Sequence, residues 1–111
     1  MERFVRGDVV VLPFPFSDLT LSKRRPALVL ATPGGDDLIL CQITSQNIND
    51  NLSLQLDNED FINGSLNKTS NIRPNRLFTA DKHIILYKVG QLSCKKLDSV
   101  IDRVIDILHK S

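Results

Sequence analysis

Long apolar segments, paired cysteines and clustered metal ligands are the features that this sequence of 111 residues lacks. No run of about 18 apolar residues occurs, which excludes a transmembrane helix. The first residues do not lead into an uninterrupted apolar segment, because Gly7 and Asp8 interrupt it. We therefore expect no secretory signal peptide, and a cytoplasmic protein with no membrane partner.

Cysteine and histidine are scarce, and their spacing argues against a metal site. Cys41 and Cys94 form no CxxC or CxxH pattern. Two separate thiols are the commoner arrangement in a cytosolic chain of this size, although the spacing leaves a disulfide open. His83 and His109 stand alone, without an HxH or HExxH pattern around either. We expect no metal ligands and no cofactor.

Positive charge is missing from one long stretch and concentrated on both sides of it. The net charge is +1, but it is unevenly distributed. Residues 26–67 contain six acidic residues and no lysine or arginine, whereas residues 23–25 and 68–96 are rich in basic residues. A fold that brings residues 23–25 beside Arg73 would make a positive patch suited to a phosphate backbone. Ordinary solvated surface charge is the alternative interpretation.

Apolar patterning indicates a single domain, residues 1–111, built mainly from short strands. Pro13 and Pro15 are expected to end the first strand, because proline donates no hydrogen bond to a neighbouring strand, and a long loop follows over residues 14–22. Asn63-Gly64 indicates a turn after one helical turn at residues 57–62. The predicted strands cover residues 9–12, 27–31, 38–44, 52–56, 70–79 and 84–89.

The C-terminal segment changes to a helical period. Its apolar residues recur every three or four positions, and Ser93 is a plausible N-cap. We expect this helix to cover a sheet. The predicted fold class is mainly β (α+β): a small curled antiparallel sheet or SH3-like barrel with a C-terminal helix. The apolar stripe consists of Leu97, Val100, Ile101, Val104, Ile105 and Leu108.

Several short motifs, in order along the chain, resemble the MazF/PemK/Kid family of toxins, and the match runs from about Arg6 to Leu108. They are Gly7-Asp8 before the first predicted strand, Arg25-Pro26 before the second, Gln42–Ser45 in the third, then Ile72–Asp81 and Val89–Ser93. The resemblance implies the fold shared by MazF, PemK and CcdB, and a homodimer. It also implies a growth-inhibiting, sequence-specific and metal-independent endoribonuclease that cuts single-stranded RNA. A cognate antitoxin would block the active groove with a disordered tail.

RNA cleavage by its own 2′-hydroxyl, which leaves a 2′,3′-cyclic phosphate and a 5′-hydroxyl, requires in-line geometry and charge stabilisation at the phosphorus. Arginine suits the second task, because its planar guanidinium binds two phosphate oxygens at once. By the resemblance, Arg25 matches the family's first catalytic arginine and Thr44 the threonine opposite it. A surface arginine and a threonine that merely favours a strand are the alternatives.

Arg73 completes the predicted catalytic set, because it matches an arginine that the Kid branch uses in catalysis. That branch has an acidic residue two positions further on, proposed as the base, whereas this sequence has Asn75. An amide cannot remove a proton, so the resemblance favours Arg25 with Thr44, and Arg73 as a phosphate ligand. The general base is left unassigned.

Further residues are predicted to bind RNA. Aromatic rings among cations often hold single-stranded nucleic acid by stacking and phosphate contacts. Phe14 is expected to fold inward instead. Polar residues after a strand can read base edges, although any turn contains such residues. The predicted RNA-binding residues are Phe16, Ser17, Lys23, Arg24, Ser45, Gln46, Asn75 and Arg76.

Two other functions fit the same motifs. The related CcdB branch is a non-enzymatic toxin that binds DNA gyrase, and such a binder has no chemical need for an Arg25/Thr44 pair. The missing base also fits an SH3-like module that binds RNA or an acidic peptide without cutting it. RNA cleavage separates the endoribonuclease from both.

Overall fold

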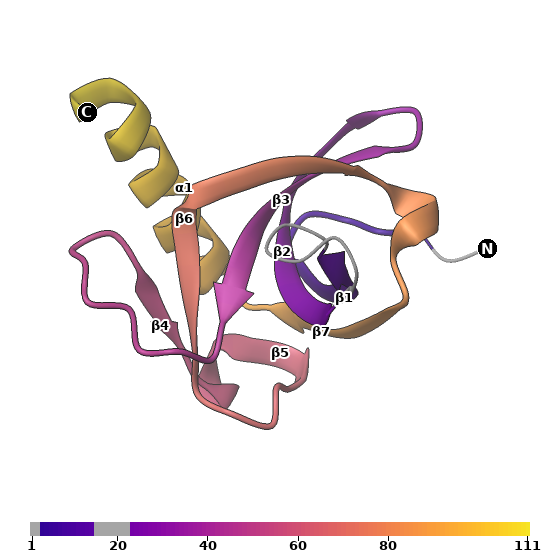
Figure 1. Cartoon of the computed structure of the whole chain (residues 1–111), viewed down its shortest axis with the longest axis horizontal. Coiled ribbons are helices and arrows are strands. Elements are labelled where there is room, and N and C mark those ends of the chain that lie inside the picture. Colours follow the sequence, from indigo (N-terminus) through magenta and orange to yellow (C-terminus); the bar gives the residue numbers. More distant parts are fainter. Residues whose placement is uncertain (1–2, 15–22) are drawn as a thin grey trace.

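The computed structural model describes residues 3–14 and 23–111. Their strands form one seven-stranded antiparallel sheet in the order β4-β6-β3-β2-β1-β7-β5. Figure 1 shows the sheet curled into a half-barrel, with one helix against its outside. The elements are β1 (Asp8–Phe14), β2 (Lys23–Gly34), β3 (Asp37–Thr44), β4 (Leu54–Leu56), the 3-10 turn η1 (Asn58–Asp60), β5 (Phe61–Gly64), β6 (Ser70–Asp81), the 3-10 turn η2 (Lys82–Ile84), β7 (Tyr87–Leu92) and α1 (Cys94–Lys110).

Alternate residues of the central strands point to opposite faces of the sheet and form two separate apolar clusters. Val9 and Cys41 belong to the cluster that also contains Leu97 and Val100 of α1. Their chain neighbours Val10 and Leu40 belong to a second cluster on the other face, together with residues of β2 and β6. Both faces of the central strands are therefore buried, which explains their nearly continuous apolar sequence.

The C-terminal helix is present as predicted, with Ser93 as its N-cap: the Ser93 hydroxyl accepts a hydrogen bond from the backbone N–H of Lys96 at 3.2 Å. As expected for a helix that covers the sheet, Leu97, Val100, Ile101 and Val104 of the apolar stripe pack against the first apolar cluster. Ile105 is 45% exposed and Leu108 is 71% exposed, so the stripe is open to solvent in the last turns. Among the described residues, no helix is long and apolar enough to cross a membrane.

Pro13 lies inside β1 and pairs with Arg24, contrary to the prediction that it ends the first strand, and Pro15 lies outside the described residues. Pro26 likewise lies inside β2, where it pairs with Val11. The β1–β7 pairing ends at Val11, and the β2–β3 pairing begins only at Ala27. Pro13 and Pro26 thus each sit where the strand has a neighbour on one side only, so the missing N–H removes no hydrogen bond.

The second half of the chain contains a strand that the sequence pattern did not reveal. Asn63-Gly64, predicted to be a turn, belongs to β5, which pairs with β7. The predicted helical turn shrinks to η1, and the last strand begins at Tyr87, because Lys82–Ile84 form η2 after β6. β5 is four residues long, so its sequence alone carries little strand signal, and pairing with β7 decides its conformation.

Both cysteines are free, in agreement with the interpretation as two separate thiols. Cys41 is buried in β3, and desolvation raises its thiol pKa to about 12, against a smaller opposing effect of its hydrogen bond with the Leu28 backbone. Cys94 is exposed at the start of α1. A buried thiol that stays protonated is a poor nucleophile, so Cys41 serves packing.

Candidate active site

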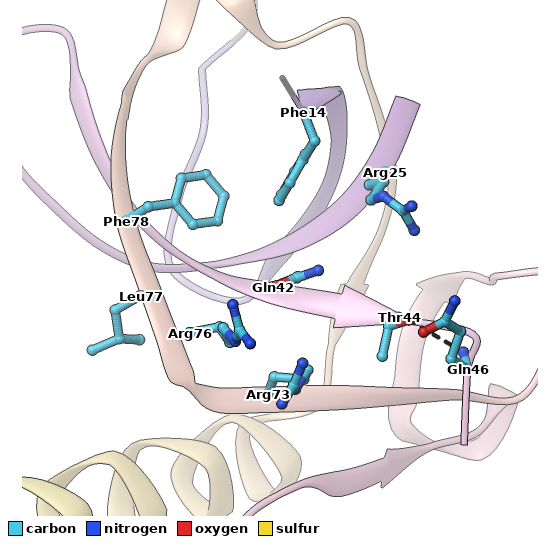
Figure 2. A pocket seen from close by; sticks show the side chains of 9 residues that line it. All are labelled: Phe14, Arg25, Gln42, Thr44, Gln46, Arg73, Arg76, Leu77 and Phe78. Carbon is cyan, nitrogen blue, oxygen red and sulfur yellow. Dashed lines mark hydrogen bonds between the residues drawn. The ribbon is translucent and has the colours of Figure 1, made fainter. Parts of the chain in front are cut away.

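A cavity of about 500 Å³ opens beside the second apolar cluster, and all three predicted catalytic residues line it. Figure 2 shows Arg25 on β2, Thr44 at the end of β3, and Arg73 on β6 around one open space. The remaining lining residues are Phe14, Gln42, Gln46, Arg76, Leu77 and Phe78.

Strand register explains why Arg25 and Thr44 face the same cavity. In the antiparallel β2–β3 pair, Ala27 lies opposite Gln42, where the pairing begins. Arg25 and Thr44 each lie two residues from this pair, on the open side of the pairing. A step of two keeps the same face of the sheet, so both side chains point to the face that carries the cavity, and both line it.

A bulge in β6 supplies the other two arginines. Arg73 lies opposite Gln42 and Leu77 lies opposite Cys41, so three residues of β6 are inserted between two adjacent positions of β3. Bulges bend a strand and redirect its side chains, and they are common beside active sites. Here the inserted residues begin with the buried Pro74 and end with Arg76, which lines the cavity together with Arg73.

The cavity is strongly positive, because three arginines and no carboxylate line it. The nearest carboxylate contact is made by Asp50, in the loop after β3. Its Oδ2 lies 3.7 Å from Nη2 of Arg73. The Nε of Arg73 is buried and has no hydrogen-bond partner among the described residues. An unpaired donor and three permanent charges make this a site for an anion with several acceptor oxygens.

The carboxylate of Asp50 is held by its own loop. Its Oδ1 accepts hydrogen bonds from the backbone N–H groups of Ser53, at 2.9 Å, and Leu52, at 3.0 Å. The hydrogen bond from the Ser53 backbone is the main reason why the pKa of Asp50 is lowered, and the charge of Arg73 adds a smaller effect. Asp50 is therefore ionised at neutral pH, but a carboxylate with a low pKa is a weak base.

Two hydrogen bonds brace the turn at the end of β3. The hydroxyl oxygen of Thr44 accepts from the backbone N–H of Gln46 at 3.2 Å, and the Asn71 amide donates to the Gln46 carbonyl at 3.0 Å. Thr44 is only 4% exposed. A hydroxyl that accepts one bond still has its own hydrogen to donate, so Thr44 can bind a phosphate oxygen inside the cavity.

Phe14 packs inward, as predicted, and is 5% exposed. Its ring meets Phe78 edge to face, with the centroids 5.1 Å apart and the planes at 78°. The pair also forms one wall of the cavity (Figure 2). Aromatic walls beside cations are a common way to hold a base next to its phosphate.

The predicted RNA-binding residues that the structure describes divide into three groups. Gln46 and Arg76 line the large cavity. Arg24 and Ser45 line a smaller one beside it. Lys23 and Asn75 are exposed and line neither of the two, while Phe16 and Ser17 lie outside the described residues.

Sequence reasoning did not single out Gln42, Phe78 or Asp50 as site residues. Gln42 was detectable, because it precedes Thr44 by two positions on the same strand face. Phe78 and Asp50 reach the site only through the bend of β6 and the path of the loop after β3.

Another group of potential metal ligands lies away from the cavity: Asp36, Asp81 and His83 place their ligand atoms within 4.8 Å of one another. All three are exposed, Lys82 lies 3.3 Å from Asp36, and His83 is already paired with Asp81 at 2.6 Å. Exposed groups that neutralise one another in this way need no ion, and we assign no metal site here.

Comparison with known proteins gives a family match over nearly the whole chain. The model of the family described as PemK-like, MazF-like toxin of type II toxin-antitoxin system matches residues 5–108. No curated protein sequence matches this chain.

Solved structures share the fold at low sequence identity. An endoribonuclease in complex with its cognate antitoxin, from a mycobacterial species, has a TM-score of 0.77 and 12% identity, with 98% of each chain covered. A MazE–MazF structure from Deinococcus radiodurans has a TM-score of 0.75 and 17% identity over the full length of both chains. The Mycobacterium tuberculosis toxin MazF-mt6 has a TM-score of 0.72 and 16% identity, with 94% of this chain and 98% of that chain covered. The predicted fold class is confirmed.

Proposed function

This chain belongs to the PemK-like, MazF-like toxin family of type II toxin-antitoxin systems, and from that premise we propose that it is an endoribonuclease that cuts single-stranded RNA. The observation that carries the proposal is that Arg25, Thr44 and Arg73 line one cavity without a carboxylate. Two of the similar solved structures are described as endoribonucleases, which supports the same activity.

In the proposed reaction, the 2′-oxygen of the substrate attacks the adjacent phosphorus, and the bond from phosphorus to the 5′-oxygen breaks. The products are a 2′,3′-cyclic phosphate and a 5′-hydroxyl. Arg25 and Thr44 bind the non-bridging oxygens, where negative charge grows in the transition state. Arg73 binds the same phosphate or its neighbour and keeps it in line with the attacking oxygen.

Proton transfer in this mechanism does not depend on an ordinary side-chain base. Arginine keeps its proton up to a pKa above about 12, and Asp50 is tied to its own loop. Asn75 is exposed outside the cavity. We propose that the 2′ proton leaves to water and that the 5′-oxygen takes a proton from water. The cavity then accelerates the reaction through positioning and charge.

The proposed biology follows the same premise. We propose one toxin domain over residues 1–111 that acts on cytoplasmic RNA in a sequence-specific manner, without a metal, as a homodimer. We also propose a cognate antitoxin whose flexible tail covers the cavity. Similar structures have been solved in complex with a cognate antitoxin and as MazE–MazF. A cavity lined by three arginines suits an acidic tail as well as RNA.

The test is a cleavage assay on a long RNA with structured and unstructured regions, in EDTA, followed by sequencing and chemical analysis of the new ends. We expect cuts in unstructured regions, with the end groups given above. Arg25→Ala should lower the cleavage rate by about a hundredfold or more, the usual effect of removing one charge-stabilising donor. Lys95→Ala, on exposed α1 and outside both cavities, is the control.

Three outcomes would contradict the proposal. Wild-type cleavage by Arg25→Ala, with unchanged folding, would remove the active site from this cavity. Salt-sensitive RNA binding without turnover would instead indicate a binding module. Inhibition of DNA supercoiling by gyrase, without RNA cleavage, would indicate a gyrase-binding toxin.

A further inference from the structure

The smaller cavity, of about 240 Å³, shares two residues with the large one: Arg25 and Thr44 line both. It is formed by the start of β2, the end of β3 and the segment that leads into β6. In Figure 2, Arg25 and Thr44 stand at one end of the large cavity, with Leu77 and Phe78 at the other. Arg25 and Thr44 therefore form a wall between two adjoining spaces.

The position of this wall limits how a substrate can bind. A phosphate held by Arg25 and Thr44 together lies at the boundary, so the nucleotides on its two sides occupy different cavities. The large cavity offers an aromatic wall and two further arginines. The small cavity needs its own means of holding the next nucleotide.

Positive charge in the small cavity can hold the next nucleotide by its phosphate. Arg24 and Lys68 line it, and no carboxylate does. Both side chains are exposed, and neither has an ion-pair partner within residues 3–14 and 23–111. A lysine and an arginine that line one depression suit a phosphate, with Ser45 and Asn67 as further hydrogen-bonding groups in the lining.

Lys68 also lies at the edge of the surface that is favourable for RNA. Lys68 and Asn67 line a third depression as well, and this one contains Asp57 and Glu59. A polyanion that continued past Lys68 would meet these carboxylates at close range, where like charges repel. The favourable surface ends at Lys68.

We propose that the small cavity is a second RNA subsite, which binds the nucleotide next to the scissile phosphate through a phosphate contact with Lys68 and Arg24. This inference rests on the proposed endoribonuclease function. It adds Lys68 and Asn67 to the RNA-binding surface and separates the two sides of the cut: the large cavity holds one side mainly by stacking and arginines, and the small cavity holds the other by its phosphate.

The test uses a cleavable RNA oligonucleotide, chosen from the mapped cuts, that is shortened one nucleotide at a time from each end. Lys68→Ala should raise KM about tenfold for oligonucleotides that fill the small cavity, the effect of one charged hydrogen bond, and leave kcat unchanged. Oligonucleotides shortened on that side should show no difference between the variant and the wild type. A neutral methylphosphonate at the contacted position should weaken wild-type binding but not binding by Lys68→Ala.

Lys95→Ala is the matched control, because Lys95 is an exposed lysine outside both cavities, and Arg24→Ala is a second variant on the opposite wall. Equal KM values for Lys68→Ala and Lys95→Ala on every oligonucleotide would overturn the second subsite while leaving the cleavage activity established. If the wild type cuts no RNA, the proposed function fails. The subsite is then tested by anisotropy with unstructured RNA oligonucleotides of mixed sequence, where loss of binding in Lys68→Ala but not in Lys95→Ala supports it and equal binding refutes it.

Discussion

Arg73 enters the cavity with one guanidinium nitrogen 3.7 Å from Asp50 and with a buried, unpaired Nε. The carboxylate of Asp50 is fixed by two backbone N–H groups of its own loop. This combination restrains Arg73, because an anchored charge limits the directions in which a flexible cation can point. Asp50 is thus a positioning residue for Arg73, although it does not line the cavity.

Asp50→Asn isolates this effect, since the amide oxygen can still accept both backbone hydrogen bonds while the charge toward Arg73 is lost. We expect kcat for RNA cleavage to fall severalfold with little change in the melting temperature. Asp50→Ala should lower both, because the loop loses its acceptor as well. Equal kcat values for Asp50→Asn and the wild type would show that Arg73 needs no carboxylate.

The pH dependence of this effect has a definite sign. The pKa of Asp50 is lowered, so its folded-state contribution is present at all pH values above the usual aspartate pKa of about 4 and is lost as the pH falls through the folded value. The ratio of wild-type to Asp50→Asn kcat should therefore be constant from pH 5 to pH 8. An inflection in this ratio near neutral pH would indicate that another group titrates with the site.

Elements far apart in the sequence hold the loop that carries Asp50. Arg103 of α1 donates hydrogen bonds from Nη1 to the backbone carbonyls of Asn51 and Leu52, each at 2.9 Å. The helix therefore does more than cover the sheet. Through Arg103 it holds the loop whose Asp50 contacts Arg73.

Arg103→Ala should release this loop without unfolding the helix. We expect faster hydrogen exchange at the Leu52 and Ser53 amides, which donate to Asp50, together with a severalfold lower kcat. Lys110→Ala, on the same helix and in an exposed ion pair with Asp106, is the control. Unchanged exchange at both amides in Arg103→Ala would show that the loop is stable without the helix.

The β5–β7 pairing depends on two glycines that face each other, Gly64 and Gly90. A Cβ on Gly64 would run into the Val89 carbonyl, whereas a Cβ on Gly35 would meet nothing within 4 Å. Gly64 and Gly35 both have a positive φ, 73° and 61° respectively. Alanine therefore costs about 1–2 kcal/mol at either of these positions from backbone strain alone.

Gly64→Ala should lose about 1–3 kcal/mol of unfolding free energy more than Gly35→Ala, because β5 must move away from β7. Urea denaturation of both variants measures the difference. Equal losses would mean that β5 shifts without cost.

At the scale of the whole molecule, a mostly apolar depression is left open by the residues that the structure describes. A depression between α1 and the sheet is lined by Leu30, Ile39, Leu77 and the helix residues Ile101, Val104 and Ile105. Exposed apolar patches of this kind mark interaction sites. The proposed homodimer gives this patch a second copy of the chain as its partner.

Ile105→Lys should therefore shift the protein from dimer to monomer, as measured by sedimentation equilibrium. Ile105 is exposed, so the substitution is not expected to unfold the protein. Ser99→Lys, on the exposed side of the same helix, adds the same single charge and is the control. A dimer of unchanged strength in Ile105→Lys would place the interface elsewhere, and a monomeric wild type would contradict the homodimer itself.

Much of the fold could be predicted because its signals are local. The β-branched run Val9–Val11, the alternation up to Thr44 and the three-to-four spacing after Ser93 each reflect burial on one side of a short segment. The family motifs around Arg25 and Arg73 were readable for the same reason. The short strand β5 and the positions of Pro13 and Pro26 inside strands could not be predicted, because they depend on which neighbouring strand each segment pairs with.

The sequence by itself determined most of the strands, the helix, the family and the residue types of the site, since spacing along a chain controls which side chains share a face. Only the tertiary structure decided that Arg25 and Thr44 line one cavity, that Arg73 and Arg76 join them at a three-residue insertion in β6, and that Asp50 and Lys68 lie nearby. These placements depend on strand register and on loop paths, which are set by packing between segments that are distant in the sequence.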